Sequence, residues 1–489
     1  MRLQVLADGA TDLEMSPGCG DLEIASLTAD SRSVRPGSLF AALPGAKADG
    51  AQFVADAIAK GAAAVLLKRD AKVAVPARVG LLMAPEPRQA FARLAARFWG
   101  QQPRTIVAVT GTSGKTSVAD FARQIFDRLG HAAASLGTLG VVKGGVASYG
   151  VLTTPDPVTL HQTLARLAQE GVTHLAMEAS SHGLDQYRLD GVALRAAAFT
   201  NLGRDHLDYH PSMDAYLKAK LRLLTELLPE AGAAVINADA AHAGPAIAAA
   251  RIAGRRVVTV GRAAASTLQL EEQRPVGFGQ RLRVRHGDTV VALHLPLLGD
   301  YQAANALLAA ALVMATGEAH LDALAALEHL EGVKGRLEIV GEARGGLIVI
   351  DYAHKPDALA AALRALKPFA AARIVCVFGC GGDRDKGKRP IMGRIACELA
   401  SSVIVTDDNP RSENAAAIRA EILAAAPGAR EIGDRGEAIR TAVRLLGSGD
   451  VLLIAGKGHE TGQIIGSTVV PFSDHEAVRA ALAEAPLNA

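Results

Sequence analysis

At 489 residues the chain is too long for a single hydrophobic core, so roughly two to four domains are expected. Hydrophobic residues make up 49% and charged residues 21% of the sequence, and the net charge is only +2. This balance is typical of a soluble globular protein, and it excludes an overall field that attracts nucleic acid or an anionic membrane.

The cysteines and the apolar runs indicate a cytoplasmic protein. The four cysteines show no CxxC pair and no disulfide-framework density: Cys19, Cys376, Cys380 and Cys397. Cys380 lies in a glycine loop, where it is either reactive or, as we favour, a small buried thiol. Residues 1–10 lack the apolar core of a signal peptide. The longest uncharged run, 301–317, is too short and too polar to span a membrane and predicts a soluble core helix.

Residues 1–101 alternate short strands and helices, which predicts a small α/β domain. The expected strands are 39–43 and 64–67, and the expected helices are 53–60 and 88–99. Asp30, Ser31 and Arg32 precede a Pro-Gly turn and by themselves indicate only turn chemistry. Residues 100–103 read as the linker into the next domain.

A phosphate-loop pattern follows this linker. Residues 105–109 form a β-branched, uncharged run that predicts a buried parallel strand, and 118–129 predict a helix. The intervening loop carries two glycines, a lysine and hydroxyl side chains: Gly111, Thr112, Ser113, Gly114, Lys115, Thr116 and Ser117. Glycines let backbone N–H groups face an anion at the helix start. The glycine spacing is tighter than the common pattern, so a chance glycine turn is the alternative; we favour ATP.

In a phosphate loop two of these residues have known roles. Lys115 would neutralise β/γ-phosphate charge, and the Thr116 hydroxyl would ligate Mg²⁺. From 104 to 335 strands and helices alternate, which predicts a mostly parallel sheet with helices on both faces. A strand at 175–179 delivers Glu178 to the same sheet edge, either as a Mg²⁺ ligand or as a solvated strand end.

Polar and basic residues then follow the strand predicted at 198–201. They are dense in histidine and aspartate and indicate either a metal or phosphate cluster or a polar loop: Arg204, Asp205, His206, Asp208 and His210. Residues 212–228 predict an amphipathic helix. Lys220 borders its apolar stripe, whereas Lys218 points to water; a lysine at such an edge usually snorkels.

Strands are also expected at 257–260, 282–285 and 290–295, the last in an antiparallel hairpin. The third segment, from 336, opens with a strand at 347–351, and a strand at 374–378 runs into a glycine loop. No acidic strand end lies about 20 residues on, which disfavours NAD. Four bases instead favour an anion: Arg384, Lys386, Lys388 and Arg389.

Two more strands of this segment end in polar motifs. The strand at 403–406 leads to Asp408-Asn409-Pro410-Arg411, and the strand at 451–455 leads to 456–460. In a doubly wound sheet such strand ends converge on one crevice, so a ligand site is expected there.

These segments in this order resemble the Mur ligase family over nearly the whole chain. The resemblance rests on the motifs at 30–32 with 36–40, 111–116, 152–155, 178–182, 201–210, 335–338, 351–354, 408–411 and 456–460. Within the family it is most similar to the members that add the third residue of the cell-wall peptide. The family implies a UDP-sugar-binding α/β domain at 1–101, a central ATP-binding P-loop domain with a mostly parallel sheet at 102–335, and a Rossmann-like α/β amino-acid-binding domain at 336–489.

The resemblance also implies an activity. It is the ATP-dependent addition of meso-diaminopimelate to UDP-N-acetylmuramoyl-L-alanyl-D-glutamate, in peptidoglycan precursor synthesis and hence in cell shape and division. ATP would phosphorylate the D-glutamyl γ-carboxylate, and the amine of diaminopimelate would attack the acyl phosphate. The expected partners are small molecules, with no nucleic acid and no membrane insertion.

Roles carry over position by position. ATP contacts are implied for residues 111–117 and for Asn305, Arg336 and Asp351. The metal ligands implied are Thr116, Glu178, His206 and Lys220, the last as a carbamate, and the catalytic set is Lys115, Glu178, His206 and Lys220. Ser31 would contact the UDP end. The implied sugar and peptide contacts are Thr153, Thr154, Ser180, Gln186 and Arg188. Those to diaminopimelate are Arg384, Asp408, Asn409, Pro410, Arg411, Gly456 and Glu460.

Three positions depart from the family pattern. Ser113 replaces the usual Asn, Lys355 replaces a common Thr, and residues 46–48 stand where uridine contacts vary. The alternatives are a lysine-adding or D-alanyl-D-alanine-adding Mur ligase and a folylpolyglutamate synthetase. A different class is a regulatory module that binds ATP and a wall precursor without joining them.

Overall fold

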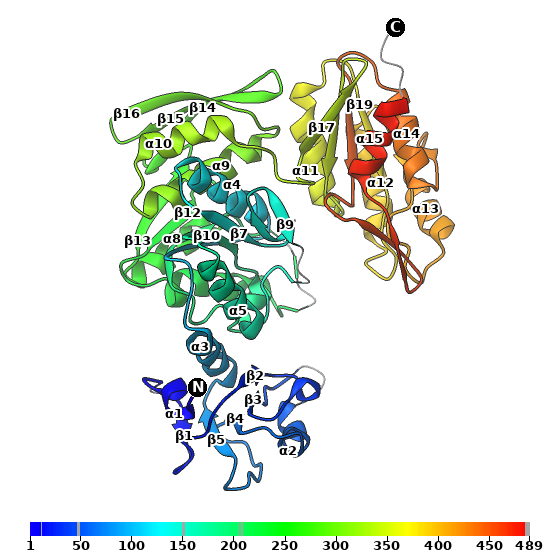
Figure 1. Cartoon of the computed structure of the whole chain (residues 1–489). Coiled ribbons are helices and arrows are strands. Elements are labelled where there is room, and N and C mark those ends of the chain that lie inside the picture. The colour runs from blue at the N-terminus through cyan, green and yellow to red at the C-terminus, as the bar shows by residue number, and fades with distance from the viewer. Residues whose placement is uncertain (11, 46–48, 149–151, 204, 207–208, 485–489) are drawn as a thin grey trace. The chain divides into compact units, whose positions relative to one another are not determined.

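The computed structural model describes the chain except residues 11, 46–48, 149–151, 204, 207–208 and 485–489 (Figure 1). It divides into two compact units. One comprises Met1–Thr267 and Leu308–Ala323, and the other comprises Leu268–Leu307 and Leu324–Ala489. The helices α9 (Asp300–Ala315) and α10 (His320–Ala325) run across the division in sequence. Each unit is built on mostly parallel sheets.

The first sheet is five-stranded, in the order β1-β5-β4-β3-β2. Its strands are β1 (Glu14–Met15), β2 (Ser26–Thr28), β3 (Ser38–Ala41), β4 (Ala64–Lys68) and β5 (Gly80–Ala84), with β1 antiparallel to β5 and the other pairs parallel. The helices are α1 (Leu3–Ala7), α2 (Val54–Ala59) and α3 (Pro87–Trp99). Leu39 and Leu66 pack in one core with Phe91 of α3, while Phe40 and Val65 pack in another with Val54 of α2. The alternation of side chains along a strand thus covers both faces, as expected.

The second sheet carries the predicted phosphate loop. Within the first unit its order is β13-β12-β11-β6-β10-β7-β8-β9. The parallel strands are β6 (Thr105–Thr110), β7 (Ala133–Gly137), β10 (His174–Glu178), β11 (Leu194–Phe199), β12 (Ala233–Asn237) and β13 (Arg256–Gly261), followed at the edge by antiparallel β8 (Gly140–Lys143) and β9 (Val146–Ser148). The helices are α4 (Lys115–Arg128), α5 (Pro157–Gln169), α6 (Ser181–Asp185), α7 (Met213–Arg222) and α8 (Ala243–Ile252).

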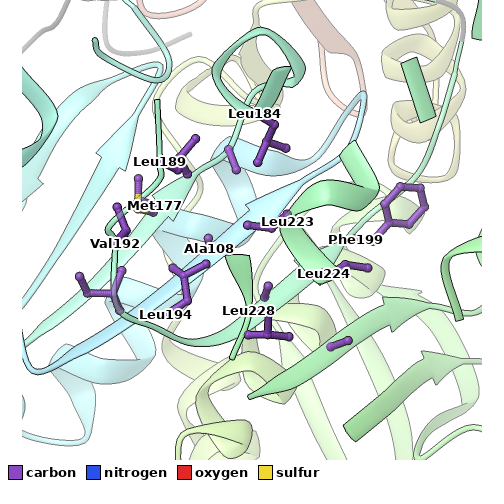
Figure 2. Packing of buried hydrophobic residues seen from close by; sticks show 14 of the residues in the cluster. Ala108, Met177, Leu184, Leu189, Val192, Leu194, Phe199, Leu223, Leu224 and Leu228 are labelled. Atoms are coloured by element: carbon purple, nitrogen blue, oxygen red, sulfur yellow. The ribbon is translucent and has the colours of Figure 1, made fainter. Parts of the chain in front are cut away.

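The core of this sheet brings the predicted site elements together. Ala108 of β6 and Met177 of β10 share one cluster with Leu223, Leu224 and Leu228, which follow α7 (Figure 2). Because β10 and β11 both pair with β6, their carboxyl ends lie on either side of the loop that follows β6. Parallel strands place these ends at one edge, as the sequence predicted.

The second unit begins with an antiparallel meander, β14 (Leu268–Val276), β15 (Gly279–His286) and β16 (Thr289–Leu295), which confirms the predicted hairpin. A six-stranded sheet follows, in the order β17-β18-β22-β19-β20-β21. Its strands are β17 (Glu338–Ala343), β18 (Gly346–Asp351), β19 (Ile374–Phe378), β20 (Ser402–Val405), β21 (Arg430–Glu431) and β22 (Val451–Ala455); only β17 is antiparallel. A separate hairpin joins β23 (Gly462–Ile465) to β24 (Thr468–Pro471).

Helices cover both faces of this sheet (Figure 1). They are α11 (Pro356–Leu366), α12 (Lys388–Leu399), α13 (Ala415–Leu423), α14 (Arg435–Arg444) and α15 (Asp474–Glu484). Cys376 and Phe378 pack with α11 and α12, while Val375 and Val377 pack with α14 and α15. The buried Cys380 thiol has its pKa raised to about 11 by burial, which supports the small buried thiol over the reactive one.

The uncharged run at 301–317 forms α9, which confirms the predicted core helix. Among the residues described here, none of the helices combines the length and the apolar character that a membrane crossing requires.

Acid should weaken the first unit through His161 of α5. Its side chain is only 2% exposed, its Nε2 lies 3.1 Å from the Asp190 carbonyl oxygen, and burial lowers its pKa from 6.5 to about 4. The unfolded chain binds this proton below 6.5 and the folded chain only below about 4. The stability contribution is therefore complete above the higher value and is lost as the pH falls through this window.

We expect His161→Gln to remove about 1–2 kcal/mol of the loss in unfolding free energy between roughly pH 7 and pH 5. Urea denaturation at the two pH values measures it. His329→Gln, at an exposed position, is the control and should retain the wild-type pH dependence. An unchanged pH dependence in His161→Gln would contradict the assignment.

Candidate active site

The loop after β6 is shaped for close approach to an anion. Gly111 has φ 151°, and a Cβ there would come within 1.9 Å of Thr200 Oγ1. Gly114 has φ 86° and precedes α4, whose first turn receives no side-chain cap from the described residues. The backbone N–H groups of that turn and the positive helix end are the elements of an anion site. The helix begins at Lys115, three residues before the predicted start.

Residues from the end of β11 brace this loop. Ser113 N donates to Asn201 Oδ1 at 3.0 Å, and Thr200 Oγ1 donates to the Ser113 carbonyl oxygen at 2.6 Å. Thr112 N donates to the Asn201 carbonyl oxygen at 2.9 Å. Both backbone groups of Ser113 are thus hydrogen-bonded, and the loop cannot move away from the end of β11 without losing these bonds.

Two lysines donate to one carbonyl oxygen of this loop. Lys115 Nζ lies 2.9 Å and Lys220 Nζ 2.7 Å from the Gly111 oxygen. Lys220 is 1% exposed, and its Nζ lies 4.4 Å from the centre of the Tyr216 ring. Burial, and then the neighbouring Lys115 charge, lower the pKa of Lys220 well below its usual value, while Asp205 opposes the shift. A lowered pKa increases the fraction of the neutral, nucleophilic amine.

The burial of Lys220 corrects the expectation that a lysine at the border of the apolar face snorkels. Lys220 is buried with Tyr216 and Leu223, while Lys218 is exposed, as expected. The α-helix ends at Arg222 and continues as one π turn, Leu223–Leu227 (η3). The apolar stripe predicted for 212–228 is nevertheless confirmed, because its five members lie in or pack against one core: Met213, Leu217, Leu221, Leu224 and Leu228.

Glu178 at the end of β10 is a buried, held carboxylate rather than a solvated strand end. It is 2% exposed. Thr138 N donates to its Oε1 at 2.8 Å, and Thr138 Oγ1 donates to its Oε2 at 3.3 Å. A Cβ on Gly137 would lie 2.2 Å from Oε1, so only glycine leaves room for this arrangement.

The predicted peptide-binding residues form one network around Glu178. Thr154 Oγ1 donates to the Glu178 carbonyl oxygen at 3.1 Å and accepts from Ser180 N at 3.0 Å. Arg188 Nη1 donates to the Thr154 carbonyl oxygen at 2.7 Å. The remaining two members join at its edges, Thr153 through Thr138 and Gln186 through Arg188.

The histidine-rich loop is aromatic and partly exposed. His206 has φ 53°, and its Nε2 lies 3.6 Å from Asp205 Oδ2. The His206 ring meets His182 edge-on at 4.9 Å between centroids. Arg204 and Asp208 of the predicted cluster, and residues 46–48, lie outside the described residues. Ser31 begins a short 3-10 helix, Ser31–Ser33 (η1), and its carbonyl oxygen accepts from Lys60 Nζ at 3.1 Å.

In the second unit the predicted nucleotide-binding residues lie on α9 and at the first strands of the six-stranded sheet. Asn305 Nδ2 donates to Gln302 Oε1 at 2.9 Å, and the Arg336 guanidinium lies over the Tyr352 ring at 4.7 Å. Asp351 Oδ2 accepts from Leu337 N at 2.7 Å. Burial raises the pKa of Asp351, and the Arg336 charge opposes that shift.

The ends of β19, β20 and β22 meet, as predicted. Asn409 Nδ2 donates to Glu460 Oε2 at 3.0 Å. Arg411 has φ 51° and its Nη1 donates to the Gly382 carbonyl oxygen at 2.8 Å. Gly456 has φ 114°, and a Cβ there would lie 2.8 Å from Asp408 Oδ2. The glycines that follow β19 therefore pack directly against residues 408–411, and the Pro410 carbonyl lies against Gly382.

Three of the four bases in the loop after β19 bond to other segments of the chain, so the expected anion site rests on Arg384. Arg389 is fully buried, and it pairs with Glu413 and Glu421 at 2.9 Å each. Lys386 pairs with Glu413 at 3.2 Å, and Lys388 donates to the His354 carbonyl oxygen at 2.8 Å. Arg384 is exposed and donates to the Asp383 carbonyl oxygen at 3.0 Å. The other three bases thus attach the loop to residues 354, 413 and 421.

Sequence reasoning missed Thr138, Tyr352 and Lys457 as members of these networks. Lys457 is 0% exposed, and its Nζ lies 3.1 Å from Asn409 Oδ1. The available signal was its position, because Lys457 stands directly beside Gly456 and three residues before Glu460, both of which were predicted as site residues.

Comparisons with known proteins agree along the whole chain. Three family models match it: "Mur ligase family, catalytic domain" over residues 23–99, "Mur ligase middle domain" over 109–313 and "Mur ligase, glutamate ligase domain" over 335–458. The UDP-N-acetylmuramoyl-L-alanyl-D-glutamate--2,6-diaminopimelate ligase of Bradyrhizobium diazoefficiens is 58% identical over 475 residues, covering 96% of this chain and 97% of that protein. The enzyme of the same name from Caulobacter vibrioides is 54% identical over 472 residues, 95% and 96% of the two chains.

Solved structures give the same picture. A structure of a UDP-N-acetylmuramoyl-L-alanyl-D-glutamate--2,6-diaminopimelate ligase matches with a TM-score of 0.75 at 32% identity, covering 99% of each chain. A MurF structure from Acinetobacter baumannii matches with a TM-score of 0.63 at 21% identity, over 99% and 98% of the chains, which shows the shared fold. From its identity to these relatives over nearly its full length, the chain belongs to the Mur ligase family.

Proposed function

We propose that this chain joins meso-diaminopimelate to UDP-N-acetylmuramoyl-L-alanyl-D-glutamate, with cleavage of ATP, in peptidoglycan precursor synthesis. It is an ATP-dependent acid–amino-acid ligase, and its substrates are small molecules. The observation that carries the proposal is the 58% identity, over 96% of the chain, to a ligase of this name. The meeting of Asn409, Arg411 and the Glu460 segment at one sheet edge supports the amino-acid end of the reaction.

The residues of the first unit fit ATP and Mg²⁺. The loop at 111–114 offers N–H donors, and its glycines have no Cβ to block an anion. Lys115 supplies a positive charge beside Gly111, and Glu178 is a buried carboxylate. Residues 111–117 would hold the phosphates, with Thr116, Glu178, His206 and modified Lys220 as metal ligands. Bound Mg²⁺ offsets negative charge on the transferring phosphate. In the second unit Asn305, Arg336 and Asp351 would contact the nucleotide.

The other substrate contacts follow from the networks. Thr154, Ser180 and Arg188 are held against Glu178, and with Thr153 and Gln186 they would bind the sugar and peptide; Ser31 would bind the UDP end. For the amino acid, Arg384 and Arg411 would pair with carboxylates, and Asp408, Asn409, Pro410, Gly456 and Glu460 would complete the site. Diaminopimelate has one carboxylate more than lysine, which favours a site with two arginines.

Lys220 is proposed to react with CO₂ through its ζ-nitrogen to form a carbamate. Its depressed pKa provides the neutral amine that this addition requires. The change replaces one of the two lysine amino groups at the Gly111 carbonyl by an oxygen ligand suited to Mg²⁺.

The reaction has two steps. The D-glutamyl γ-carboxylate oxygen attacks the γ-phosphorus of ATP and ADP leaves, giving an acyl phosphate. The amine of diaminopimelate then attacks the acyl carbon, a C–N bond forms, and phosphate departs while the amine loses a proton. Activation is needed because a carboxylate cannot expel oxide. Lys115 offsets charge on the transferring group.

We further propose the domain boundaries 1–101, 102–335 and 336–489, and a cytoplasmic location. The five-stranded sheet closes by residue 84 and α3 ends at Trp99, where Gly100 adopts φ 71°, which supports the first boundary. The buried thiols of Cys376 and Cys380 suit a reducing compartment.

Phosphate release tests the function directly. It should require both the UDP-dipeptide and diaminopimelate, and the product mass should show diaminopimelate chosen over an equal amount of L-lysine. Preference for lysine or for D-alanyl-D-alanine would assign another Mur activity. Binding of ATP and precursor with no joint dependence would mean a regulatory module.

A further inference from the structure

Lys457 is a buried cation that the proposed chemistry does not use. It lies between Gly456 and Gly458 after β22, and its side chain is 0% exposed. Taking an ammonium out of water is costly unless polar partners replace the water. Its Nζ lies 3.1 Å from Asn409 Oδ1, 3.3 Å from Glu460 Oε2 and 3.8 Å from Asp408 Oδ1. All three partners belong to the proposed amino-acid site.

The first consequence concerns the amide of Asn409. Its Oδ1 accepts from Lys457 Nζ at 3.1 Å and from Ile464 N at 2.9 Å. Both neighbours are donors that cannot accept, so the amide oxygen must face them. The Nδ2 group therefore points the other way and donates to Glu460 Oε2 at 3.0 Å. The amide orientation is fixed by the surrounding donors.

The second consequence concerns Glu460. One carboxylate oxygen, Oε2, receives both Lys457 and Asn409, while Oε1 lies 3.5 Å from Tyr352 Oη. The ammonium thus anchors one oxygen and leaves the other with capacity to accept from a ligand ammonium. The ammonium also offsets one of the two negative charges of Asp408 and Glu460, so the three side chains together carry a net charge of −1.

We propose that Lys457 is a positioning residue of the amino-acid site: its buried ammonium sets the amide of Asn409 and the carboxylate of Glu460 in the orientation that binds the incoming amino acid. The inference rests on the proposed function for the location of that substrate. Without the ammonium, Asn409 Oδ1 keeps only the Ile464 N–H as a donor and Glu460 Oε2 keeps only the Asn409 amide, so both groups are held less firmly. The extra negative charge also opposes the carboxylates of diaminopimelate.

The test is the Michaelis constant for each substrate in Lys457→Met, which keeps the length of the side chain and removes the charge. We expect KM for diaminopimelate to rise about 10- to 100-fold, and KM for ATP and the UDP-dipeptide to stay within about twofold. Lys457→Gln, which retains a donor for Asn409 Oδ1, should lie between wild type and Lys457→Met, and it serves in place of Lys457→Met if that variant fails to fold.

A double variant separates positioning from general support of the fold. If Lys457 acts in part through Asn409, adding Lys457→Met to Asn409→Ala should raise KM for diaminopimelate by a smaller factor than Lys457→Met does alone, because only the contact of Lys457 with Glu460 and the charge effect remain to be lost. Arg373→Met is the matched control, because Arg373 pairs with buried Asp450 at the opposite end of the same strands. It should lower thermal stability and leave that KM unchanged.

Three results would overturn the inference: an unchanged KM for diaminopimelate in folded Lys457→Met, an equal rise in all three constants, or effects of the two substitutions that multiply in full. A wild-type enzyme that rejects diaminopimelate would instead contradict the proposed function. The same constants would then be measured with the amino acid that the wild-type enzyme uses, and they decide the role of Lys457 independently.

Discussion

Replacing Lys220 with alanine should lower turnover by at least about 1,000-fold, and short carboxylic acids such as formate or acetate should restore part of it. The ζ-nitrogen of Lys220 lies 2.7 Å from the Gly111 carbonyl oxygen beside Lys115, where an oxygen ligand is proposed to form. An added carboxylate supplies such oxygens without the covalent tether, so recovery to roughly tenfold above the untreated variant is expected. Phosphate release with all three substrates present measures both effects.

Lys218→Ala is the matched control, since Lys218 is an exposed lysine on the same helix. It should retain wild-type turnover and show no response to added acid. Loss of turnover in Lys220→Ala without rescue, in a variant that still binds ATP, would point to a role in holding the loop instead. Full activity without any additive would remove Lys220 from the metal site.

The strand ends that carry the two proposed sites could be predicted because the sequence signal for each strand is local. Residues 374–378 and 451–455 are uncharged and mostly aliphatic, each is followed at once by glycine, and the structure has strands with these same bounds. Where several such runs alternate with helices, the parallel sheet and its shared edge follow from connection geometry. The fold class could therefore be predicted from the sequence.

The burial of Lys220 could not be predicted, because it depends on partners far away in the chain. Its acceptor, the Gly111 carbonyl oxygen, precedes it by 109 residues. The helical periodicity of 212–228 correctly predicts the apolar face, whose residues pack in one core. It carries no information on which distant segment covers the border of that face, where Lys220 lies.

The basic loop after β19 is a second case in which distant partners decide the role of a charged residue. Arg389 looked like part of an anion site because Glu413 and Glu421, its ion-pair partners, lie 24 and 32 residues further on. The proposed role of Lys457 likewise depends on its hydrogen bond to Asn409, 48 residues away. Counting charges within a loop cannot separate a ligand site from an internal ion-pair network.

Replacing Arg411 with alanine should reduce kcat/KM for diaminopimelate about 30- to 3,000-fold and narrow the preference over lysine. The backbone holds Arg411 in place: its N donates to the Ile464 carbonyl oxygen at 3.0 Å, and its own carbonyl oxygen accepts from Gly466 N at 2.7 Å. Its Nη1 bond to the Gly382 carbonyl at 2.8 Å then aims the guanidinium. Removing one side of a desolvated arginine–carboxylate pair costs about 2–5 kcal/mol, which gives this range.

Arg411→Lys separates charge from shape, because an ammonium keeps the charge and loses the planar fork that binds a carboxylate through two bonds. We expect it to recover only a minor part of the lost kcat/KM, and Arg364→Ala, at an exposed position on α11, to change nothing. Product masses from competing diaminopimelate and lysine measure the preference. If Arg411→Ala slows both amino acids by the same factor, Arg411 binds the carboxylate that they share, and the discrimination between them must come from another residue of the site, of which Arg384 is the remaining cation proposed for it.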